Sequence, residues 1–143
     1  MDNVLFFMTP KSQVCYLNSD FTIRQALEKI KFHRYTSVPV IDKFGKYVGT
    51  ITEGDILWYI VDNEILDVKK LEEIKLSEVQ RNRDNFAINV SSKISDLFNV
   101  IINQNFIPLV DDSNVFIGIV TRRRVIDYLQ KQNLNKNNNK EEK

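Results

Sequence analysis

Three consecutive arginines, Arg122, Arg123 and Arg124, follow Thr121 and have the chemistry to bind phosphate. If Thr121 caps a helix that begins here, the three side chains occupy its first turn, where the positive end of the helix dipole disfavours cations by about 0.3–1 kcal/mol each. A bound anion would remove this conflict, because helix N-termini and guanidinium groups both bind phosphate. From the residues alone, a phosphate site and a set of solvated cations paired with nearby aspartates explain the triplet equally well.

A second helix start carries charges of the opposite sign. Thr52 is followed by Glu53 and Asp55. Acids in a first turn stabilise the helix dipole, while a threonine at this position caps the free backbone amides. Capping alone explains Thr52 and Asp55, so these residues indicate a ligand site only if other features do.

The cysteine, the histidine and the acidic pairs of the chain give little support to an enzymatic function. The chain has one cysteine, Cys15, and one histidine, His33, which lie apart in the sequence, and the acidic pairs at 72–73 and 111–112 fall in a predicted linker and a predicted turn. One cysteine and one histidine also exclude a disulfide framework and a zinc site of the usual spacing. We therefore predict no catalytic residues and no metal, and we expect Cys15 to be a small buried side chain.

Composition indicates a compact cytoplasmic protein. The chain has 143 residues, of which 43% are hydrophobic, enough for a single core. Its net charge of +1 argues against a nucleic-acid or membrane-surface partner, which would need a strongly basic face. The apolar runs are far shorter than the roughly 18 residues that span a bilayer. The residue after Met1 is acidic, unlike the basic start of a signal peptide.

The elements that must position these residues occur twice. The sequence Ser-Val-Pro-Val-Ile-Asp at 37–42 returns as Phe-Ile-Pro-Leu-Val-Asp at 106–111, and Gly-Thr-Ile-Thr at 49–52 returns as Gly-Ile-Val-Thr at 118–121. A duplication of this kind predicts two similar units that bury their apolar faces partly against each other. A ligand cleft is then expected between the units.

Each copy is predicted to contain a strand, a helix, two strands and a helix. Apolar periodicity, β-branched runs and glycine-containing turns place the elements of the first copy at strand 13–17, helix 23–32, strands 35–42 and 47–51, and helix 53–61. The second copy has strand 85–88, helix 94–103, strands 106–111 and 115–120, and helix 122–132. The resulting boundaries are repeat 1 at 7–61, a linker with a short helix at 62–78, repeat 2 at 79–132, and a polar tail at 133–143 that we predict to be disordered.

These motifs resemble the CBS domain. The resemblance is carried by the strand that ends in Val-Pro-Val-Ile-Asp, by the hairpin, and by Gly-x-Ile-Thr-x-x-Asp at 49–55; the second copy departs from it, with Arg124 in place of the last aspartate. Two copies resemble a tandem CBS pair, or Bateman module, an α/β (α+β) fold in which β-α-β-β-α repeats pack by pseudo-two-fold symmetry. The second copy looks most like the small stand-alone Gram-positive CBS proteins that bind cyclic di-AMP.

The resemblance implies two adenine-nucleotide sites in the cleft between the repeats. In the principal site, a strand edge of repeat 1 would receive the adenine and the start of the last helix would receive phosphate, although the same strand segment could equally be an edge without a ligand. The residues implied for this site are Gln13, Val14, Cys15, Tyr35, Thr36, Ser37, Val38, Pro39, Thr121, Arg122, Arg123 and Arg124. A secondary site, for AMP or ATP or empty, would combine Thr52, Asp55, Asn85, Phe86, Ala87, Phe106, Ile107 and Pro108.

The function implied by this resemblance is a non-enzymatic nucleotide sensor that binds cyclic di-AMP and modulates a partner protein. The family implies a stringent-response synthetase or a metabolic enzyme as the partner, and a homodimer that packs through the helix at 53–61. The main alternative is an energy sensor for AMP, ADP or ATP that uses Asp55. A small nucleotide-hydrolysing enzyme is a weaker alternative, because no nucleophile with a neighbouring base is evident.

Overall fold

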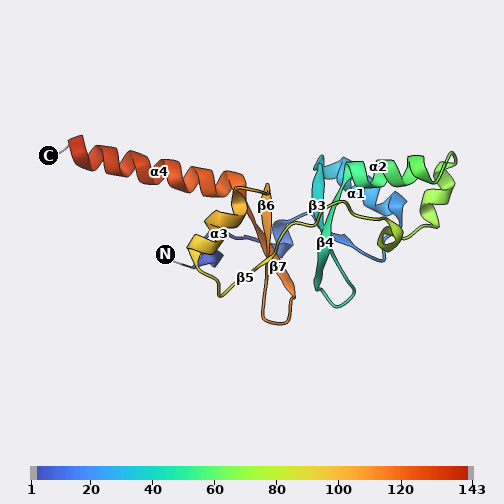
Figure 1. Ribbon diagram of the computed structural model, residues 1–143, viewed down its shortest axis with the longest axis horizontal. Helices are drawn as coiled ribbons and strands as arrows, with labels where there is room; N and C mark the ends of the chain where they lie inside the picture. Colours follow the sequence, from blue (N-terminus) through green and yellow to red (C-terminus); the bar gives the residue numbers. More distant parts are fainter. Residues whose placement is uncertain (1–2, 142–143) are drawn as a thin grey trace.

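The computed structural model describes residues 3–141, which form two αβ halves that lie side by side (Figure 1). The first half has a three-stranded sheet in the order β2-β3-β4, and the second has a four-stranded sheet in the order β1-β7-β6-β5. The strands of the first half are β2 (Leu17–Asn18), β3 (Ser37–Ile41) and β4 (Tyr47–Thr52), and its helices are α1 (Ile23–His33) and α2 (Glu53–Asp62). Those of the second half are β5 (Ile88–Asn89), β6 (Phe106–Val110), β7 (Phe116–Thr121), α3 (Ile94–Ile101) and α4 (Arg122–Glu141).

The two halves repeat the same strand pairing, which confirms the duplication predicted from the sequence. In each half a two-residue strand pairs in parallel with the middle strand, β2 with β3 and β5 with β6. The middle strand then pairs in antiparallel with the next one, and a register shift occurs at equivalent positions, Val40/Ile41 and Leu109/Val110. The expected order of strand, helix, strand, strand and helix is therefore present in both copies.

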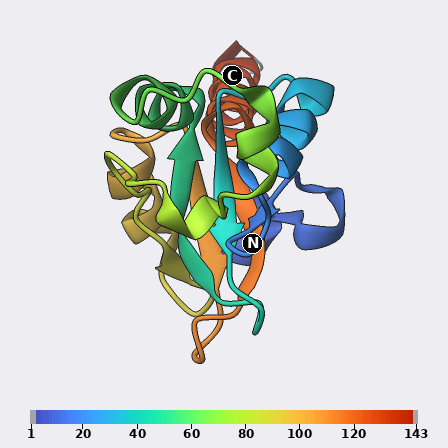
Figure 2. The ribbon, with the colours of Figure 1, turned by 90° about the vertical axis from the view of Figure 1, so that its right-hand side faces the viewer.

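The helices of the first half begin where their capping residues predict. The Thr22 hydroxyl accepts a hydrogen bond from the Gln25 amide, and the Gln25 side chain accepts one from the Thr22 amide. This capping box gives both amides a partner at the start of α1. Ile23, Ala26 and Ile30 form the buried face of α1 at helical spacing. Figure 2 looks onto this half and shows α1 and α2 on either side of the strands.

The N-terminal segment packs against the second half of the molecule, a contact that the predicted repeat boundaries did not include. The short 3-10 helix η1 (Val4–Phe7) buries Val4 and Phe7 completely in the core of the second half. The strand β1 (Thr9–Pro10) then pairs in antiparallel with β7. Because both contacts lie far away in the sequence, the repeat pattern gave no sign of them.

The linker also packs against a core. It contains two 3-10 helices, η3 (Val68–Glu72) and η4 (Leu76–Glu78), in place of the single short helix that we predicted. Leu71, Leu76 and Val79 lie in the buried cluster of the first half. The linker therefore completes the hydrophobic core of repeat 1, and it crosses this half in Figure 2.

Backbone hydrogen bonds join the hairpins of the two halves, which point the same way in Figure 1. The Phe116 amide donates to the Gly45 carbonyl at 2.9 Å, and the Tyr47 amide donates to the Asn114 carbonyl at 3.1 Å. Gly45 has a positive φ of 81°, which a residue without a Cβ adopts at no steric cost. The contact between hairpins closes one end of the interface between the halves.

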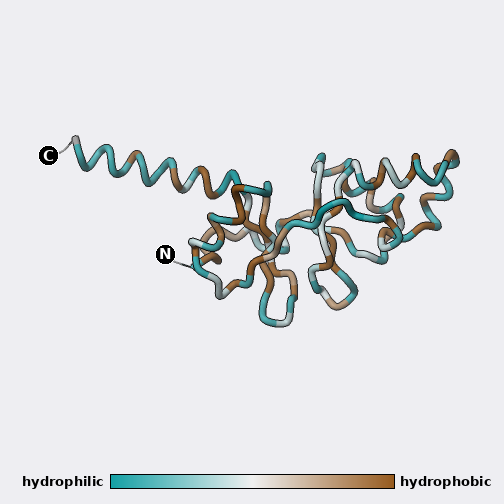
Figure 3. The backbone as a smooth tube through the Cα atoms, viewed as in Figure 1, coloured by the Kyte–Doolittle hydropathy of each residue, from teal (hydrophilic) through white to brown (hydrophobic). Residues whose placement is uncertain are grey.

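The last helix differs most from expectation. The sequence predicted its end at 132 and a disordered tail at 133–143, whereas α4 continues to Glu141; residues 142–143 lie outside the described part of the chain. Residues 133–140 are exposed, so the prediction that they bury little surface holds, but a helix that is already nucleated extends at small cost. Figure 3 shows that this outer part of α4 is largely hydrophilic. None of the helices between residues 3 and 141 is long and apolar enough to cross a lipid bilayer.

Candidate functional site

A cavity of about 280 Å³ lies between the two halves. It brings together eight of the twelve residues predicted for the principal site, Gln13, Val14, Cys15, Tyr35, Ser37, Val38, Pro39 and Thr121. Four further residues complete its lining: Thr9, Asn105, Phe106 and Ile119. Sequence reasoning missed Thr9 because β1 crosses to the second half, and it had placed Phe106 in the secondary site.

The cavity opens where the parallel ladder of the first sheet stops. The strand β2 pairs with β3 only at Val40 and Ile41, so the side of β3 from Ser37 to Pro39 has no strand beside it. The residues before β2 take an irregular course there, although the sequence predicted a strand at 13–17. Backbone groups of this short open edge can pair with a planar ligand.

Cys15 is buried in the wall of the cavity, as expected for a small hydrophobic side chain. Burial raises the pKa of its thiol, and the positive charge of Lys29 offsets this only in part. A raised pKa keeps the sulfur protonated near neutral pH, and a thiol is a poor nucleophile compared with a thiolate. The side chain can contribute apolar contact, and its environment does not activate it.

The three arginines do not line the cavity, in contrast to the sequence prediction. Arg122 donates from its guanidinium group to the carbonyl oxygens of Ile101 at 3.2 Å and Ile102 at 3.4 Å, at the C-terminal end of α3. The C-terminal end of a helix attracts cations. The end of α3 therefore stabilises the positive charge of Arg122, which the N-terminal end of α4 disfavours. Thr121 caps α4 by accepting a hydrogen bond from the Arg124 amide at 3.2 Å, as predicted.

The other two arginines differ from each other. The Arg124 guanidinium lies over the ring of Phe6, with 5.5 Å to the ring centroid. Arg123 is exposed and makes no side-chain hydrogen bond or ion pair with the residues between 3 and 141. It follows Thr121 in the chain by two positions and is the arginine most available to a ligand. Thr36 also stays outside the lining; its carbonyl accepts the Glu53 amide and anchors the start of α2.

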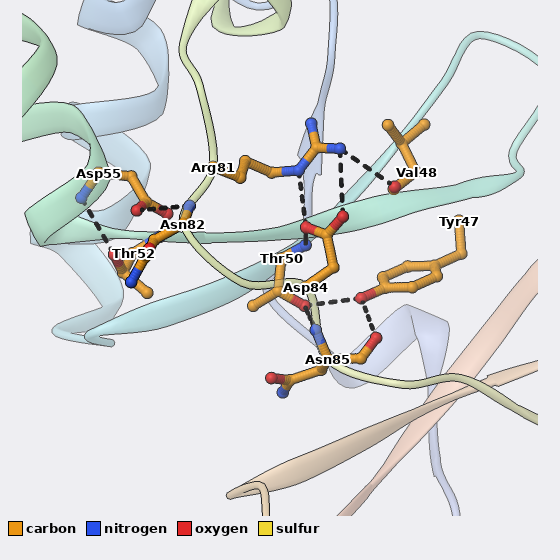
Figure 4. Close-up of polar contacts among 9 residues, drawn as sticks. All are labelled: Tyr47, Val48, Thr50, Thr52, Asp55, Arg81, Asn82, Asp84 and Asn85. Carbon is orange, nitrogen blue, oxygen red and sulfur yellow. Dashed lines mark hydrogen bonds and ion pairs between the residues drawn. The ribbon is translucent and has the colours of Figure 1, made fainter.

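Asp55, the acid predicted for the secondary site, is occupied by the chain itself. Its two carboxylate oxygens accept hydrogen bonds from the Asn82 amide at 3.1 Å and the Thr52 amide at 3.0 Å (Figure 4). Thr52 in turn accepts the Asp55 amide at 3.0 Å, so the two residues form a capping box. Asp55 is 8% exposed, and its carboxylate caps α2 and also holds the start of repeat 2 at Asn82.

A polar network joins β4 to the segment that precedes β5, next to Asp55 (Figure 4). Asp84 accepts hydrogen bonds from the buried Thr50 amide at 2.9 Å and from the Arg81 guanidinium at 2.7 Å. The Tyr47 hydroxyl lies 2.7 Å from both the Thr50 hydroxyl and the Asn85 carbonyl oxygen. Gly49 makes room for this packing, because a Cβ there would collide with Arg81 and Asp84.

The network shifts the pKa values of two of its members. Burial raises the pKa of the Asp84 carboxyl, but hydrogen bonds from Arg81 and the Thr50 amide outweigh it and hold that pKa below its ordinary value. Burial also raises the pKa of the Tyr47 hydroxyl, to about 12, against the lowering effect of its hydrogen bond with Thr50. Both groups therefore keep their ordinary charge state at neutral pH, and the network is stable there.

The remaining residues predicted for the secondary site are scattered. Ile107 and Pro108 are buried, Phe86 and Ala87 line a separate shallow depression with Asn89 and Asp96, and Phe106 faces the cavity described above. Thr52 and Asp55 line an open groove along α2. One cavity thus brings together eight residues predicted for the principal site without the arginines, and the residues predicted for the secondary site do not share one pocket.

Known proteins resemble this chain over most of its length. Residues 5–62 and 76–131 each match the CBS domain family. Cyclic di-AMP receptor B of Bacillus subtilis is 30% identical over 132 residues, which cover 91% of this chain and 89% of the receptor.

Solved structures show the same fold. A crystal structure of CbpB in complex with c-di-AMP superposes with a TM-score of 0.88 at 23% identity and covers 96% of this chain and 90% of that protein. A conserved protein of Geobacillus kaustophilus superposes with a TM-score of 0.80 at 28% identity, over 92% of this chain and 99% of that one. The paired matches confirm the architecture expected from the sequence, and the chain belongs to the CBS domain family, with two CBS domains in tandem.

Proposed function

We propose that this protein is a non-enzymatic sensor that binds cyclic di-AMP in the cavity between its two CBS domains and thereby modulates a partner protein. The observation that carries the proposal is the cavity itself, which joins the open edge of β3 to Thr121 at the start of α4. The 30% identity to a cyclic di-AMP receptor over 91% of this chain supports the choice of ligand.

The walls of the cavity suit an adenine base. Val38, Pro39 and Ile119 supply apolar surface, and the open backbone of β3 supplies donors and acceptors. Ligand sites commonly combine a mostly apolar lining with a few convergent polar groups, which here are Ser37 and Thr121. We assign to Arg123, two residues beyond Thr121 in the chain, the contact with a ligand phosphate outside the cavity.

The size of the cavity matches one half of the dinucleotide. A volume of about 280 Å³ is at the small end of ligand pockets, which usually hold about 300–1,000 Å³. One adenosine would occupy the cavity, and the rest of cyclic di-AMP would lie outside it. We expect one ligand per chain, because the residues implied for a second site do not share one pocket.

The alternative of an AMP, ADP or ATP sensor has less support. In that alternative Asp55 would bind the ribose, but its two carboxylate oxygens already accept hydrogen bonds from backbone amides. A nucleotide at that position would have to displace the Asn82 segment. The cavity near Thr121 remains open to a mononucleotide, so the choice of ligand has to be measured.

We also propose a homodimer that packs through α2. Leu57, Trp58 and Val61 share one face of this helix and are 56%, 62% and 52% exposed. Three large apolar side chains on one surface are typical of a protein contact. Trp58→Asp should convert the dimer into a monomer in light scattering after size exclusion, and a wild-type monomer would contradict this part of the proposal.

Calorimetric titration tests the ligand. The protein is titrated with cyclic di-AMP, AMP, ADP and ATP, and the products are checked for hydrolysis. We expect saturable heat with cyclic di-AMP at one ligand per chain, weaker binding of the mononucleotides, and intact nucleotides afterwards. Tighter binding of AMP or ATP would favour the energy sensor, and released product would favour an enzyme.

A further inference from the structure

A second pocket adjoins the cavity and differs from it in charge. It has a volume of about 360 Å³ and shares Gln13, Val14, Cys15 and Tyr35 with the cavity. Its remaining lining residues are Lys11, Ser12, Tyr16, Lys29 and His33. Two lysines and a histidine thus converge on one pocket whose lining contains no carboxylate.

The two lysines lie on the same aromatic ring. The ammonium nitrogens of Lys11 and Lys29 are 5.1 Å and 5.0 Å from the centroid of Tyr16. Each contact with the ring stabilises a cation modestly, but two like charges around one ring repel each other. An anion between them would offset that repulsion.

Neither lysine forms an ion pair with a carboxylate of residues 3–141. The neighbouring acid Glu28 pairs instead with Arg24, at 2.9 Å. Lys29 donates one hydrogen bond to the Tyr16 carbonyl at 2.9 Å, which fixes its ammonium group at the pocket and leaves two N–H donors for a ligand. The position of Lys29 is therefore set before any anion arrives.

Tyr35 stands at the border between the cavity and the cationic pocket. Its ring is stacked on His33, with centroids 6.0 Å apart and planes 5° apart, and the side chain is half exposed. A ligand that leaves the cavity past Tyr35 would reach the lysines directly. Such a ligand must be longer than the single nucleoside that the cavity holds.

We propose that Lys11 and Lys29 form an anion subsite that receives a phosphate group of the nucleotide seated in the adjoining cavity. The subsite deepens the proposed function and rests on it, because it selects a ligand with a phosphate remote from the buried adenosine. It assigns phosphate recognition to repeat 1, in addition to Arg123 of repeat 2. Because cyclic di-AMP has two phosphodiester groups, we expect one to bind this subsite and the other to bind Arg123.

The test compares a double variant with a matched control. Lys11→Gln/Lys29→Gln removes both charges of the subsite, and Lys31→Gln/Lys69→Gln removes two exposed lysines outside it. We expect the double variant to bind cyclic di-AMP at least about tenfold more weakly, as loss of charged hydrogen bonds predicts, and to bind adenosine like the wild type. The control should match the wild type for both ligands. Affinity of the double variant for cyclic di-AMP within twofold of the control would overturn the proposal.

A second measurement separates the subsite from the proposed function. Inorganic pyrophosphate is titrated into the wild-type protein, and backbone amide shifts of Ser12, Lys29 and His33 are followed by NMR. Shifts at these residues that vanish in the double variant support the subsite even if the protein binds no cyclic di-AMP, in which case only the proposed function fails. No shifts with pyrophosphate, together with unchanged nucleotide affinity, reject the subsite.

Discussion

The carboxylate of Asp84 accepts the backbone amide of Thr50 at 2.9 Å, across the interface between the two CBS domains. Thr50 is the counterpart of Ile119, which lines the open cavity on the other side of the pseudo-two-fold axis. Asp84 precedes β5 by the same number of residues as Gln13 precedes β2. Asp84 and Thr50 are thus joined by a hydrogen bond, whereas their counterparts Gln13 and Ile119 line an open cavity.

Asp84→Ala should lower the free energy of unfolding by about 1–2 kcal/mol, because it leaves the buried Thr50 amide without an acceptor. Arg81 also loses its ion pair with Asp84, but the Asp84 side chain is 41% exposed and this pair adds little. Urea denaturation measures the change. Asp20→Ala is a matched control at an exposed aspartate and should change stability by less than about 0.5 kcal/mol.

The contribution of Asp84 to the free energy of unfolding should depend on pH. Its folded pKa lies below the value of about 3.9 for an unfolded aspartate. The stabilisation is therefore complete above the unfolded pKa and is lost as the pH falls through the folded pKa. The stability difference between the wild type and Asp84→Asn should be constant near neutral pH and shrink below about pH 4. A difference that grows in acid would contradict the assignment.

Tyr47→Phe should destabilise the protein by about 1 kcal/mol, since the hydroxyl bridges Thr50 and the Asn85 carbonyl across the domain interface. In a spectrophotometric titration, Tyr47 should ionise with a pKa of about 12. Because the folded pKa is raised, the protonated hydroxyl contributes stability that is complete below the unfolded pKa near 10. This stability is lost as the pH rises through about 12. Tyr59→Phe is the control, and equal effects of the two substitutions would contradict the bridge.

Substitution of Arg122 should affect the stability of the protein, and substitution of Arg123 should affect ligand binding. Arg122→Ala removes the contact with the end of α3 and should cost about 1 kcal/mol in thermal or urea unfolding. Arg123→Ala should leave unfolding unchanged within about 0.5 kcal/mol but weaken cyclic di-AMP binding about tenfold. Equal affinities of Arg123→Ala and the wild type would exclude Arg123 as a phosphate contact.

Val14→Trp should fill the cavity. Val14 lines both the cavity and the cationic pocket and is only partly buried, so the larger ring can project into the open space without disrupting the core. We expect calorimetry to detect no binding of cyclic di-AMP and circular dichroism to report a folded protein. Ile102→Trp, at an exposed position, should bind normally; loss of binding in both variants would point to an effect unrelated to the cavity.

The sequence allowed the duplicated fold and most of the residues that line the cavity to be predicted, because both depend on local patterns. The capping boxes at Thr22 and Thr52 set the starts of α1 and α2, and the repeated Pro-containing strands place Pro39 and Pro108 at equivalent positions. The strand predicted at 13–17 was wrong for most of its length, because this segment lines the cavity and pairs with β3 only from Leu17.

Two predictions made from spacing left out partners that are distant in the chain. Three arginines at a helix start predict an anion, but the C-terminal end of α3 is close enough to satisfy Arg122. A Thr-x-x-Asp motif predicts a ribose contact, and it gives no sign that the Asn82 amide of repeat 2 donates to Asp55. Spacing within one element cannot indicate which other element will lie against it.

Amide chemical-shift mapping with cyclic di-AMP tests the central claim most directly, because it reports where on the protein the ligand binds. We expect the largest shifts at Gln13, Val14, Ser37 and Thr121, and small shifts around Asp55 and Asp84. Large shifts confined to Thr52, Asp55 and Asn82, or no shifts at saturating ligand, would contradict that claim.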